Sequence, residues 1–336
     1  NYTNMNGCTA TAPTLLNDLV HPLPIPSLIG LTSVCVGAGG VTYSTEGGMT
    51  NYQWSLSAGG SITSGKMVAL NSINVTWSSA GPQGIGVNYT NSNGCTAASE
   101  VLLPVMVNAL PIPDLTGPTS VCLGNTVSYS TEAGMNGYTW QISSGGTITS
   151  GSTSETITVL WNTSGNQTVS VNYSNLDGCT ALSASQIDVY VHGLPTPSVT
   201  GPASACNGAI QTFGTQSGML AYSWDLSTGG SIIPGLTDNE INVLWETPGD
   251  HSISVNYTDI FGCTAPQPTL YPVSVHPLPT PTIIGATSVC VGSESNVYST
   301  EAGMTAYTWA ISSGGTITAG GGINDNAVEV VWNNEG

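Results

Sequence analysis

The sequence predicts an all-β protein made of tandem β-sandwich repeats that together form an elongated rod. Three observations predict it. The motif Leu-Pro-x-Pro recurs every 84 to 87 residues. Within each repeat, apolar and polar residues alternate at period two, which is typical of half-buried strands. The 336 residues include 42 Gly and 20 Pro, a composition that favours short strands and turns over helices.

The repeat keeps a fixed register. A Cys follows the leucine of each motif by twelve residues, and a Trp follows that Cys by 18 or 19. A second Trp comes 21 or 23 residues later, and a Gly-Cys pair ends 18 residues after it. The cysteines are Cys8, Cys35, Cys95, Cys122, Cys179, Cys206, Cys263 and Cys290. The tryptophans are Trp54, Trp77, Trp140, Trp161, Trp224, Trp245, Trp309 and Trp332.

This register divides the chain into five segments. Residues 1–22 are the C-terminal part of a preceding repeat, 23–109, 110–193 and 194–277 are complete repeats, and 278–336 are the N-terminal part of a further one. We expect the chain to be a window from a longer repeat array. The alternative is that the first strands of one chain complete the last domain of the next, because the two partial segments amount to nearly one repeat.

Each repeat contains several short alternating segments. In the second repeat, strands are expected at residues 138–142, 157–161 and 169–173, and the same patterns recur in the third. About seven strands in roughly 85 residues, with a Trp on the third, predict an immunoglobulin-like β-sandwich. The Trp side chains alternate with apolar neighbours, so we expect them in the core rather than on a sugar-binding surface.

Glycines mark the turns between these strands. Gly145-Gly146 is expected to supply positive φ for a tight hairpin, as are its equivalents at 59–60, 229–230 and 314–315. Asn93-Gly94 and Asp177-Gly178 are two-residue hairpin signals just before a Cys.

The linkers are rich in proline at alternate positions. Such segments favour an extended, semi-rigid polyproline conformation. The spacing between cysteines across a linker is 27 in every case, whereas the spacing inside a repeat is 60, 57 and 57. We therefore expect a stiff rod that rises about 40 Å per repeat. The linker residues are Leu23, Pro24, Pro26, Leu110, Pro111, Pro113, Leu194, Pro195, Pro197, Leu278, Pro279 and Pro281.

The charge balance excludes several classes of partner. Nineteen Asp and Glu against a single basic residue, Lys66, give a formal charge of −18. Nucleic acids and acidic membrane surfaces need Lys and Arg for binding, so neither is an expected partner. The chain is 40% hydrophobic, which argues against disorder. It also lacks an apolar run long enough for membrane insertion.

Several motifs resemble a known family. Ser120-Val121-Cys122, Tyr129 to Met135 and Val171 to Ala181 resemble the PKD-like, immunoglobulin-like repeats of giant surface proteins from gliding bacteria. The resemblance implies the stalk of a cell-surface adhesin exported by type IX secretion. Its implied partners are neighbouring repeats of the same chain and other surface or secretion-system components. The third repeat departs at Phe213 to Met219 and loses a Glu, so this Glu is not an indispensable ligand.

The cysteines are expected to form disulfides rather than a zinc site, because no Cys-x-x-Cys pair is present. Disulfides imply an extracellular location. Two connectivities are open. Pairing inside repeats gives Cys35–Cys95, Cys122–Cys179 and Cys206–Cys263. Pairing between neighbouring repeats gives Cys35–Cys179 and Cys122–Cys263, and we favour it because the two cysteines of one sandwich are expected at opposite ends, about 30 Å apart.

Other polar residues suggest no catalytic or cofactor site. His21, His192 and His276 precede linkers where Asn108 stands in the fourth case, so we expect polar junction residues rather than catalytic bases. His251 is solitary. No catalytic constellation is shared between repeats, and we expect no enzyme.

The acidic residues and the single lysine bear on two further kinds of site, a calcium site and an isopeptide cross-link. Asp238, Glu240 and Asp325 lie in clusters that could hold Ca²⁺ weakly, although the first two repeats lack them and solvated loops are expected. Isopeptide cross-links are excluded for most repeats because Lys66 is the only Lys.

The sequence thus predicts a structural role, a stiff disulfide-stapled rod that holds a binding tip away from the cell. Two alternatives remain open: spacer repeats of a secreted polysaccharide-degrading enzyme, and a self-assembling extracellular matrix fibre.

Overall fold

The computed structural model describes residues 1–65, 70–233 and 237–335. All of its regular elements are β-strands, as predicted. The chain divides into two compact units, Asn1–Leu194 and Pro195–Gly336. Among the described residues, no helix is long and apolar enough to cross a membrane. Lys66, on which the isopeptide argument depends, lies outside the described residues.

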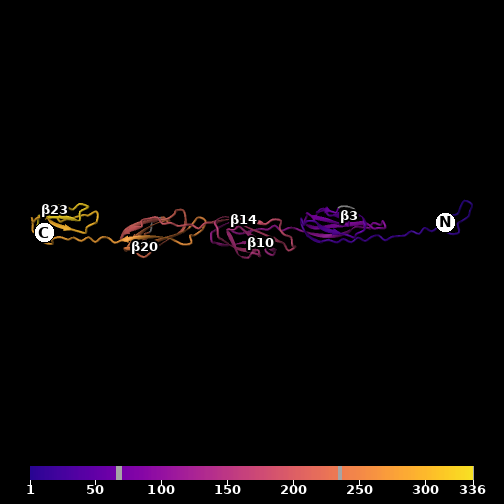
Figure 1. Cartoon of the computed structure of the whole chain (residues 1–336), viewed down its shortest axis with the longest axis horizontal. Helices are drawn as coiled ribbons and strands as arrows, with labels where there is room; N and C mark the ends of the chain where they lie inside the picture. The colour runs from indigo at the N-terminus through magenta and orange to yellow at the C-terminus, as the bar shows by residue number, and fades with distance from the viewer. Residues whose placement is uncertain (66–69, 234–236, 336) are drawn as a thin grey trace. The chain divides into compact units, whose positions relative to one another are not determined.

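Repeat 1 (residues 23–109) folds into two sheets, shown in Figure 1 near the label β3. A four-stranded sheet has the order β1-β7-β6-β3, and a three-stranded sheet has the order β2-β5-β4. The strands are β1 (Ser33–Cys35), β2 (Val41–Ser44), β3 (Thr50–Leu56), β4 (Gly60–Ser64), β5 (Ser72–Trp77), β6 (Gly81–Thr90) and β7 (Val101–Asn108).

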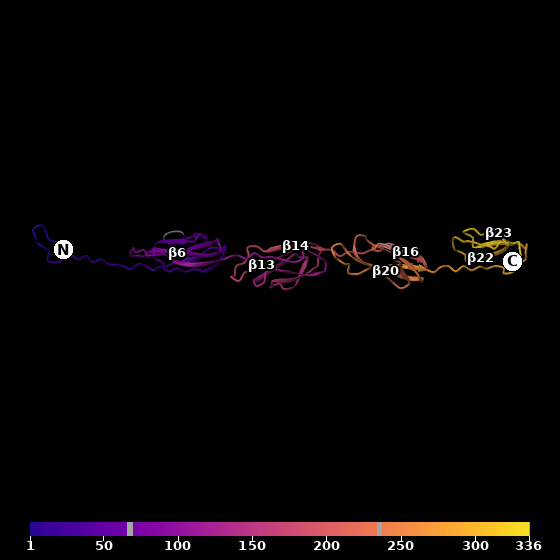
Figure 2. The ribbon, with the colours of Figure 1, turned by 180° about the vertical axis from the view of Figure 1, so that it is seen from behind.

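Repeat 2 (residues 110–193) has the same topology, with sheets β10-β13-β14-β8 and β11-β12-β9. The three strands predicted from its alternation are confirmed as β10, β12 and β13. Strands β13 and β14 lie side by side in Figure 2, and they pair antiparallel over seven positions. The strands are β8 (Ser120–Cys122), β9 (Thr126–Ser130), β10 (Asn136–Ile142), β11 (Gly146–Ser150), β12 (Thr156–Trp161), β13 (Gly165–Ser174) and β14 (Ser185–His192).

Repeat 3 (residues 194–277) repeats this arrangement in sheets β15-β21-β20-β17 and β16-β19-β18. Residues 278–335 contain one three-stranded sheet of order β22-β24-β23. The strands of repeat 3 are β15 (Ser204–Cys206), β16 (Ile210–Gly214), β17 (Leu220–Leu226), β18 (Gly230–Ile233), β19 (Glu240–Trp245), β20 (Gly249–Thr258) and β21 (Thr269–His276). The last three strands are β22 (Asn296–Ser299), β23 (Gly315–Gly320) and β24 (Ala327–Trp332).

The first and last strands of each complete repeat pair in parallel. In repeat 1, Cys35 at the end of β1 lies opposite Asn108 at the end of β7. In repeat 2, Cys122 at the end of β8 lies opposite His192 at the end of β14. The first strand of a sandwich therefore ends beside the point where the chain leaves for the next linker.

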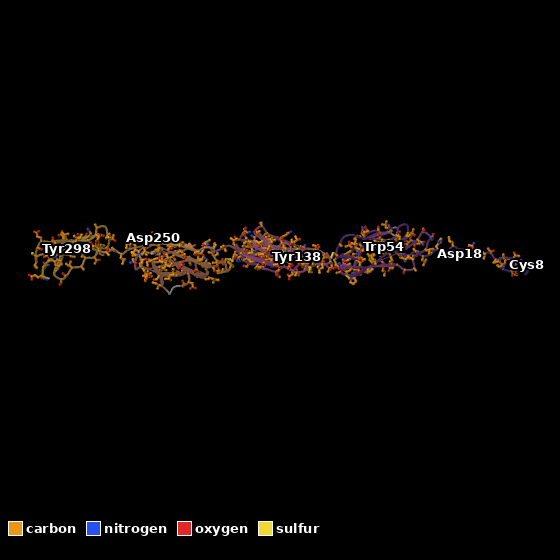
Figure 3. All side chains as sticks on the ribbon, turned by 90° about the horizontal axis from the view of Figure 1, so that it is seen from below. Cys8, Asp18, Trp54, Tyr138, Asp250 and Tyr298 are labelled. Carbon is orange, nitrogen blue, oxygen red and sulfur yellow. A yellow bond between two sulfur atoms is a disulfide. The ribbon has the colours of Figure 1, made fainter. Side chains whose placement is uncertain are left out.

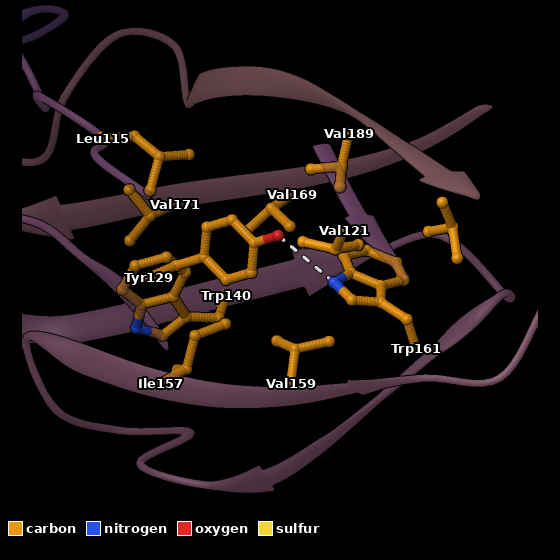
Figure 4. Packing of buried hydrophobic residues seen from close by; sticks show 11 residues of the cluster. Leu115, Val121, Tyr129, Trp140, Ile157, Val159, Trp161, Val169, Val171 and Val189 are labelled. Atoms are coloured by element: carbon orange, nitrogen blue, oxygen red, sulfur yellow. Dashed lines mark hydrogen bonds between the residues drawn. The ribbon is translucent and has the colours of Figure 1, made fainter. Parts of the chain in front are cut away.

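The core lies between the two sheets of each sandwich. In repeat 2 it contains Tyr129, Trp161, Val169 and Val171, all fully buried (Figure 4). Every second residue of β13 is buried from Gln167 onward, which is the alternation that predicted the strand. The pattern therefore places one face of β13 inside the sandwich and leaves the other face only partly covered.

The glycine pairs between the third and fourth strands act differently from the prediction. Of these eight glycines only Gly229 has positive φ. A Cβ on Gly146 would lie 2.8 Å from the ring of Trp161, and one on Gly145 would lie 2.3 Å from the side chain of Gln167. Close packing against the side chains of Gln167 and Trp161, rather than backbone conformation, therefore explains this pair.

The hairpin before the second Cys is also longer than predicted. Gly178 has φ of 79°, and its N–H donates to the carbonyl of Asn175 at 3.0 Å. The N–H of Asn175 donates to the carbonyl of Cys179 at 2.9 Å. This is a three-residue loop, 176–178, that ends in a left-handed Gly, and not a two-residue loop. The turn leaves Cys179 immediately after the tip of the hairpin.

Candidate functional site at the repeat junction

A disulfide joins repeats 1 and 2. It links Cys35 to Cys179, with 5.5 Å between the Cα atoms and a sequence separation of 144. Cys35 lies at the end of repeat 1 from which the linker leaves, because β1 ends beside the end of β7. The two repeats are therefore connected covalently twice, once by the linker and once by the disulfide.

The hairpin of repeat 2 presents Cys179 through one asparagine. The side-chain oxygen of Asn175 accepts the backbone N–H groups of Asp177 at 3.1 Å and Cys179 at 2.9 Å. Its Nδ2 donates to the carbonyl of Ala109 at 3.0 Å, directly before the linker motif. The same side chain thus shapes the hairpin and fixes the start of the linker.

The disulfide decides between the two predicted connectivities for Cys35. The pairs Cys35–Cys95 and Cys122–Cys179 do not form, because Cys35 is joined to Cys179. Cys95 precedes β7 and Cys35 lies beside its far end, so an eight-residue strand, about 26 Å long, separates them. That distance is far beyond the reach of a disulfide.

The remaining cysteines fall into two groups. Cys122 and Cys263 are also disulfide-bonded. The predicted pair Cys206–Cys263 does not form, because Cys206 is a free thiol. The free cysteines among the described residues are Cys8, Cys95, Cys206 and Cys290. Figure 3 shows Cys8 on the N-terminal segment, where it is exposed.

A glutamate fixes the other end of the linker. The carboxylate of Glu132 accepts the backbone N–H of Asp114, the residue that follows the second linker proline, at 3.0 and 3.1 Å. It also accepts the hydroxyls of Thr131 at 2.7 Å and Tyr173 at 2.6 Å. The linker between repeats 1 and 2 is thus held at both ends by repeat 2.

These hydrogen bonds favour the charged form of Glu132. Burial pushes its pKa upward, but the hydroxyls of Thr131 and Tyr173 and backbone N–H groups outweigh burial and lower the pKa to about 2. Burial, and then the bond to this carboxylate, raise the pKa of Tyr173. The carboxylate is therefore ionised across the physiological range and acts as a permanent acceptor.

The same arrangement occurs in repeat 1 and in residues 278–335. Glu46 accepts the backbone N–H of Ser27 at 3.0 Å, and Glu301 accepts that of Thr282 at 3.1 Å. Despite burial, bonds from Ser27 and Thr45 lower the pKa of Glu46 to about 2. Bonds from the side chains of Thr282 and Thr300 lower the pKa of Glu301 to about 2 as well.

Repeat 3 holds its linker end with a neutral side chain. Gln216 accepts the N–H of Ser198 at 3.1 Å and the hydroxyl of Thr215 at 2.7 Å. Its Nε2 donates to the hydroxyl of Ser198 at 2.9 Å. The position therefore requires a hydrogen-bond acceptor and not a charge. From the sequence, the loss of Glu in the third repeat indicates only that this Glu is not an indispensable ligand.

The family of the chain follows from its repeats. The PKD-like domain matches residues 21–103, 108–189, 194–272 and 276–335. The chain belongs to the PKD-like domain family. None of the curated proteins matches it.

Solved structures similar to these PKD-like repeats include three bacterial proteins. The D00-D0 domain of intimin is 16% identical, with a TM-score of 0.29 over 50% of this chain and 100% of that one. The Escherichia coli adhesin FdeC is 16% identical, with a TM-score of 0.30 over 77% and 100%. Invasin, a bacterial integrin-binding protein, is 18% identical, with a TM-score of 0.31 over 80% and 62%. Such distant likenesses carry no information on function.

The polar residue before each linker bonds the first strand of its own PKD-like repeat in two cases. Asn108 Nδ2 donates to the hydroxyl of Ser33 at 2.9 Å. His192 Nε2 lies 2.9 Å from the hydroxyl of Ser120. His276 is exposed at the end of β21, and His21 is half-buried. These bonds tie the strand that leaves a repeat to the strand that entered it.

The predicted core tryptophans of the PKD-like repeats form two sets. Trp77, Trp161 and Trp245 are fully buried, whereas the equivalent Trp332 is half-buried. In the other set Trp140 is buried and Trp54, Trp224 and Trp309 are half-buried. The indole N–H of each member of this second set donates to a backbone carbonyl, of Leu70, Ser154, Asp238 or Asp325.

The residues of the linker motif differ in exposure from one linker to the next. The second proline of the motif is buried as Pro113 and Pro197 and half-buried as Pro26, whereas Pro281 is exposed. The leucines that open the motif are half-buried as Leu110 and Leu194 and exposed as Leu23 and Leu278.

The remaining polar candidates have local roles. The ring of His251 stacks on Trp245 with 5.4 Å between centroids. The carboxylate of Asp325 accepts the N–H of Gly322 in its own loop at 2.9 Å. Glu240 is the first residue of β19, and Asp238 lies two residues before this strand. Within residues 1–65, 70–233 and 237–335, no group of three His, Cys, Asp or Glu is placed to hold a metal ion.

Proposed function

We propose that this chain is part of the stalk of an extracellular surface adhesin or filament, used in attachment or gliding motility. Its role is structural rather than catalytic: the PKD-like repeats hold a binding tip away from the cell surface. The observation that carries the proposal is the disulfide between Cys35 and Cys179. A disulfide between consecutive domains restricts motion at the junction. The fold of a single sandwich does not require it.

The contacts on either side of the linker support a stiff junction. Asn175 holds the carbonyl before the linker, and Glu132 holds the N–H after it. Between these points the alternate prolines restrict φ. A flexible tether would be rich in Gly and Ser and would lack such fixed ends. The junction therefore suits a spacer that keeps its length and direction.

The cysteines also support an oxidising, extracellular location, since disulfides persist there and are rare in the cytosol. Cys122 and Cys263 occupy the positions of Cys35 and Cys179 one repeat further along the sequence, and each is disulfide-bonded. Their pairing with each other remains a prediction. The proposed partners are neighbouring repeats and other surface or secretion-system components.

Immunogold electron microscopy of intact cells that make the protein tests this proposal. An antibody raised against repeats 1 to 3 should label filaments that project from the surface. In-frame deletion of these repeats should reduce attachment under flow, while deletion of an unrelated exported protein serves as the control. Recovery of the repeats from the medium, joined to a polysaccharide-degrading domain, would support the enzyme-spacer alternative and overturn the proposal. Lateral sheets of label would support the matrix-fibre alternative and also overturn it.

A further inference from the structure

The disulfide creates a short covalent route through repeats 1 and 2. A chain that enters at Leu23 reaches Cys35 within twelve residues and crosses to Cys179, and from there Gly193 is fourteen residues away. Residues 36–178 lie outside this route. They contain β2 to β7 of repeat 1 and β8 to β13 of repeat 2, which is most of both sandwiches.

The short route is already extended in the folded protein. It consists of the linker motif, β1, the segment after Cys179, and β14, which are strands or proline-rich extended chain. Twenty-six residues can span at most about 90 Å when fully stretched. Tension along this route therefore lengthens it only slightly.

We propose that the Cys35–Cys179 disulfide is a mechanical bypass that carries tension past both sandwiches and keeps them folded. The inference rests on the proposed function, in which the repeats bear tension between a cell and a distal tip. In the oxidised protein, force applied to the linkers that flank repeats 1 and 2 runs along β1, through the disulfide and along β14. The other strands are attached to the side of this route and bear none of the applied force.

Without the disulfide, the same force would act on the sandwich itself. Tension would enter repeat 1 through the start of β1 and leave through the end of β7. These strands are parallel neighbours, so they would be pulled in opposite directions along their length. The hydrogen bonds from Met106 to Thr32 and from Val36 to Asn108 would bear the shear. Repeat 2 would be loaded in the same way between β8 and β14.

The bypass also explains why the polar junction residues bridge these two strands. In repeat 1 the strand on the short route is β1, and Asn108 of β7 donates to its Ser33. In repeat 2 the strand on the short route is β14, and its His192 bonds Ser120 of β8. In each sandwich, the strand that bears the force is thus hydrogen-bonded to a neighbouring strand that does not.

Single-molecule force spectroscopy of the full chain tests the bypass, with handles inserted in the linkers before Leu23 and after Gly193. The oxidised chain should show no unfolding step of repeat 1 or 2. After reduction, both repeats should unfold and release 144 further residues, about 500 Å of contour length. Cys35→Ser should behave like the reduced protein, whereas Cys95→Ser, which removes a free thiol, should behave like the oxidised one.

Reduction and reoxidation of the same wild-type molecules guard against a misfolded variant, since the steps should appear and disappear reversibly. Unfolding steps of equal size in the oxidised and reduced chains would overturn the bypass. The result is independent of the attachment assay. A chain that bypasses force but whose deletion leaves attachment intact would refute the proposed function and leave the mechanical inference standing.

Discussion

The indole N–H of Trp161 donates to the hydroxyl of Tyr129 at 3.2 Å, and both side chains are fully buried (Figure 4). The hydroxyl in turn donates to the carbonyl of Pro118 at 3.1 Å. This pair satisfies the only polar atom of the largest core residue. Equivalent bonds join Trp77 to Tyr43, and Trp332 to Tyr298, at 3.1 Å.

Repeat 3 lacks this bond because residue 213 is Phe. The Nε1 atom of Trp245 is buried with no partner, although its ring lies 6.3 Å from that of Phe213, as in the other pairs. Phe213→Tyr should therefore stabilise repeat 3 by about 1–2 kcal/mol, and Tyr129→Phe should destabilise repeat 2 by about 1–3 kcal/mol. Guanidinium unfolding followed by Trp fluorescence measures both changes.

The side chain of Tyr271, a neighbour of Phe213, provides a check on the expected effect of Phe213→Tyr. Tyr271 packs 6.2 Å from Phe213, and its hydroxyl donates to the carbonyl of Gly201 at 2.7 Å. Loss of stability in Phe213→Tyr would show that Tyr271 has taken the space of the missing hydroxyl. The opposite signs expected for the two variants would then be wrong.

The carboxylate of Glu132 should make repeat 2 sensitive to acid. Its pKa in the folded protein is about 2, below the usual value of 4.5. A group with a lowered pKa stabilises the fold above its unfolded pKa, and this contribution is lost as the pH falls through the folded value. The free energy of unfolding should therefore fall between about pH 4.5 and 2.

Glu132→Gln should remove that part of the pH dependence at little loss of stability near pH 7, because Gln216 performs the same role in repeat 3. Denaturation curves at a series of pH values provide the measurement. Glu155→Gln, a change at an exposed glutamate of the same repeat, serves as the control and should keep the acid dependence. Equal pH profiles for Glu132→Gln and the wild type would contradict the assignment.

The linker start should loosen when Asn175 loses its donor. Asp259 stands at this position in repeat 3, and its carboxylate accepts the N–H groups of Phe261 and Cys263 at 2.9 Å, as Asn175 does for its own hairpin. Asn175→Asp should therefore keep the hairpin but lose the bond to the carbonyl of Ala109. NMR relaxation should show greater motion at Ala109 and Leu110 with unchanged signals in β13. Unchanged linker dynamics would mean that the disulfide alone fixes the junction.

The packing of Gly146 predicts a steric cost. A Cβ there would meet the ring of the buried Trp161 at 2.8 Å, so Gly146→Ala should destabilise repeat 2 by about 1–3 kcal/mol. Gly193→Ala is the matched control, because a Cβ at Gly193 meets nothing within 4 Å. Thermal unfolding of the two variants compares them directly. Similar midpoints would show that Trp161 can move aside without cost.

Much of the fold could be predicted from the sequence, because the period-two alternation reports which face of a strand is buried. Val169 and Val171 illustrate this, since both point into the core from β13. The Gly145-Gly146 pair could not be interpreted correctly, because its constraints are the side chains of Gln167 and Trp161, which are distant in the sequence. Turn propensities depend on the local backbone conformation and give no information about a contact between residues so distant in the sequence.

The junction was predictable only in part. The constant spacing across the linkers indicated a conserved geometry, and the expected ends of the sandwich favoured pairing between repeats. The roles of Glu132 and Asn175 cannot be predicted from the sequence, because their partners are backbone groups of the linker that no side-chain pattern identifies. The one available signal was the substitution of Gln216 for Glu, which preserves the acceptor and removes the charge.

Disulfide mapping of the purified protein tests the central claim most directly. Pepsin at low pH is the suitable protease, because thiol exchange is suppressed and because one Lys and no Arg leave trypsin almost no site. Mass spectrometry of the unreduced digest should find a peptide containing Cys35 linked to one containing Cys179, and reduction should separate them. A peptide pair linking Cys35 to Cys95 would contradict the account.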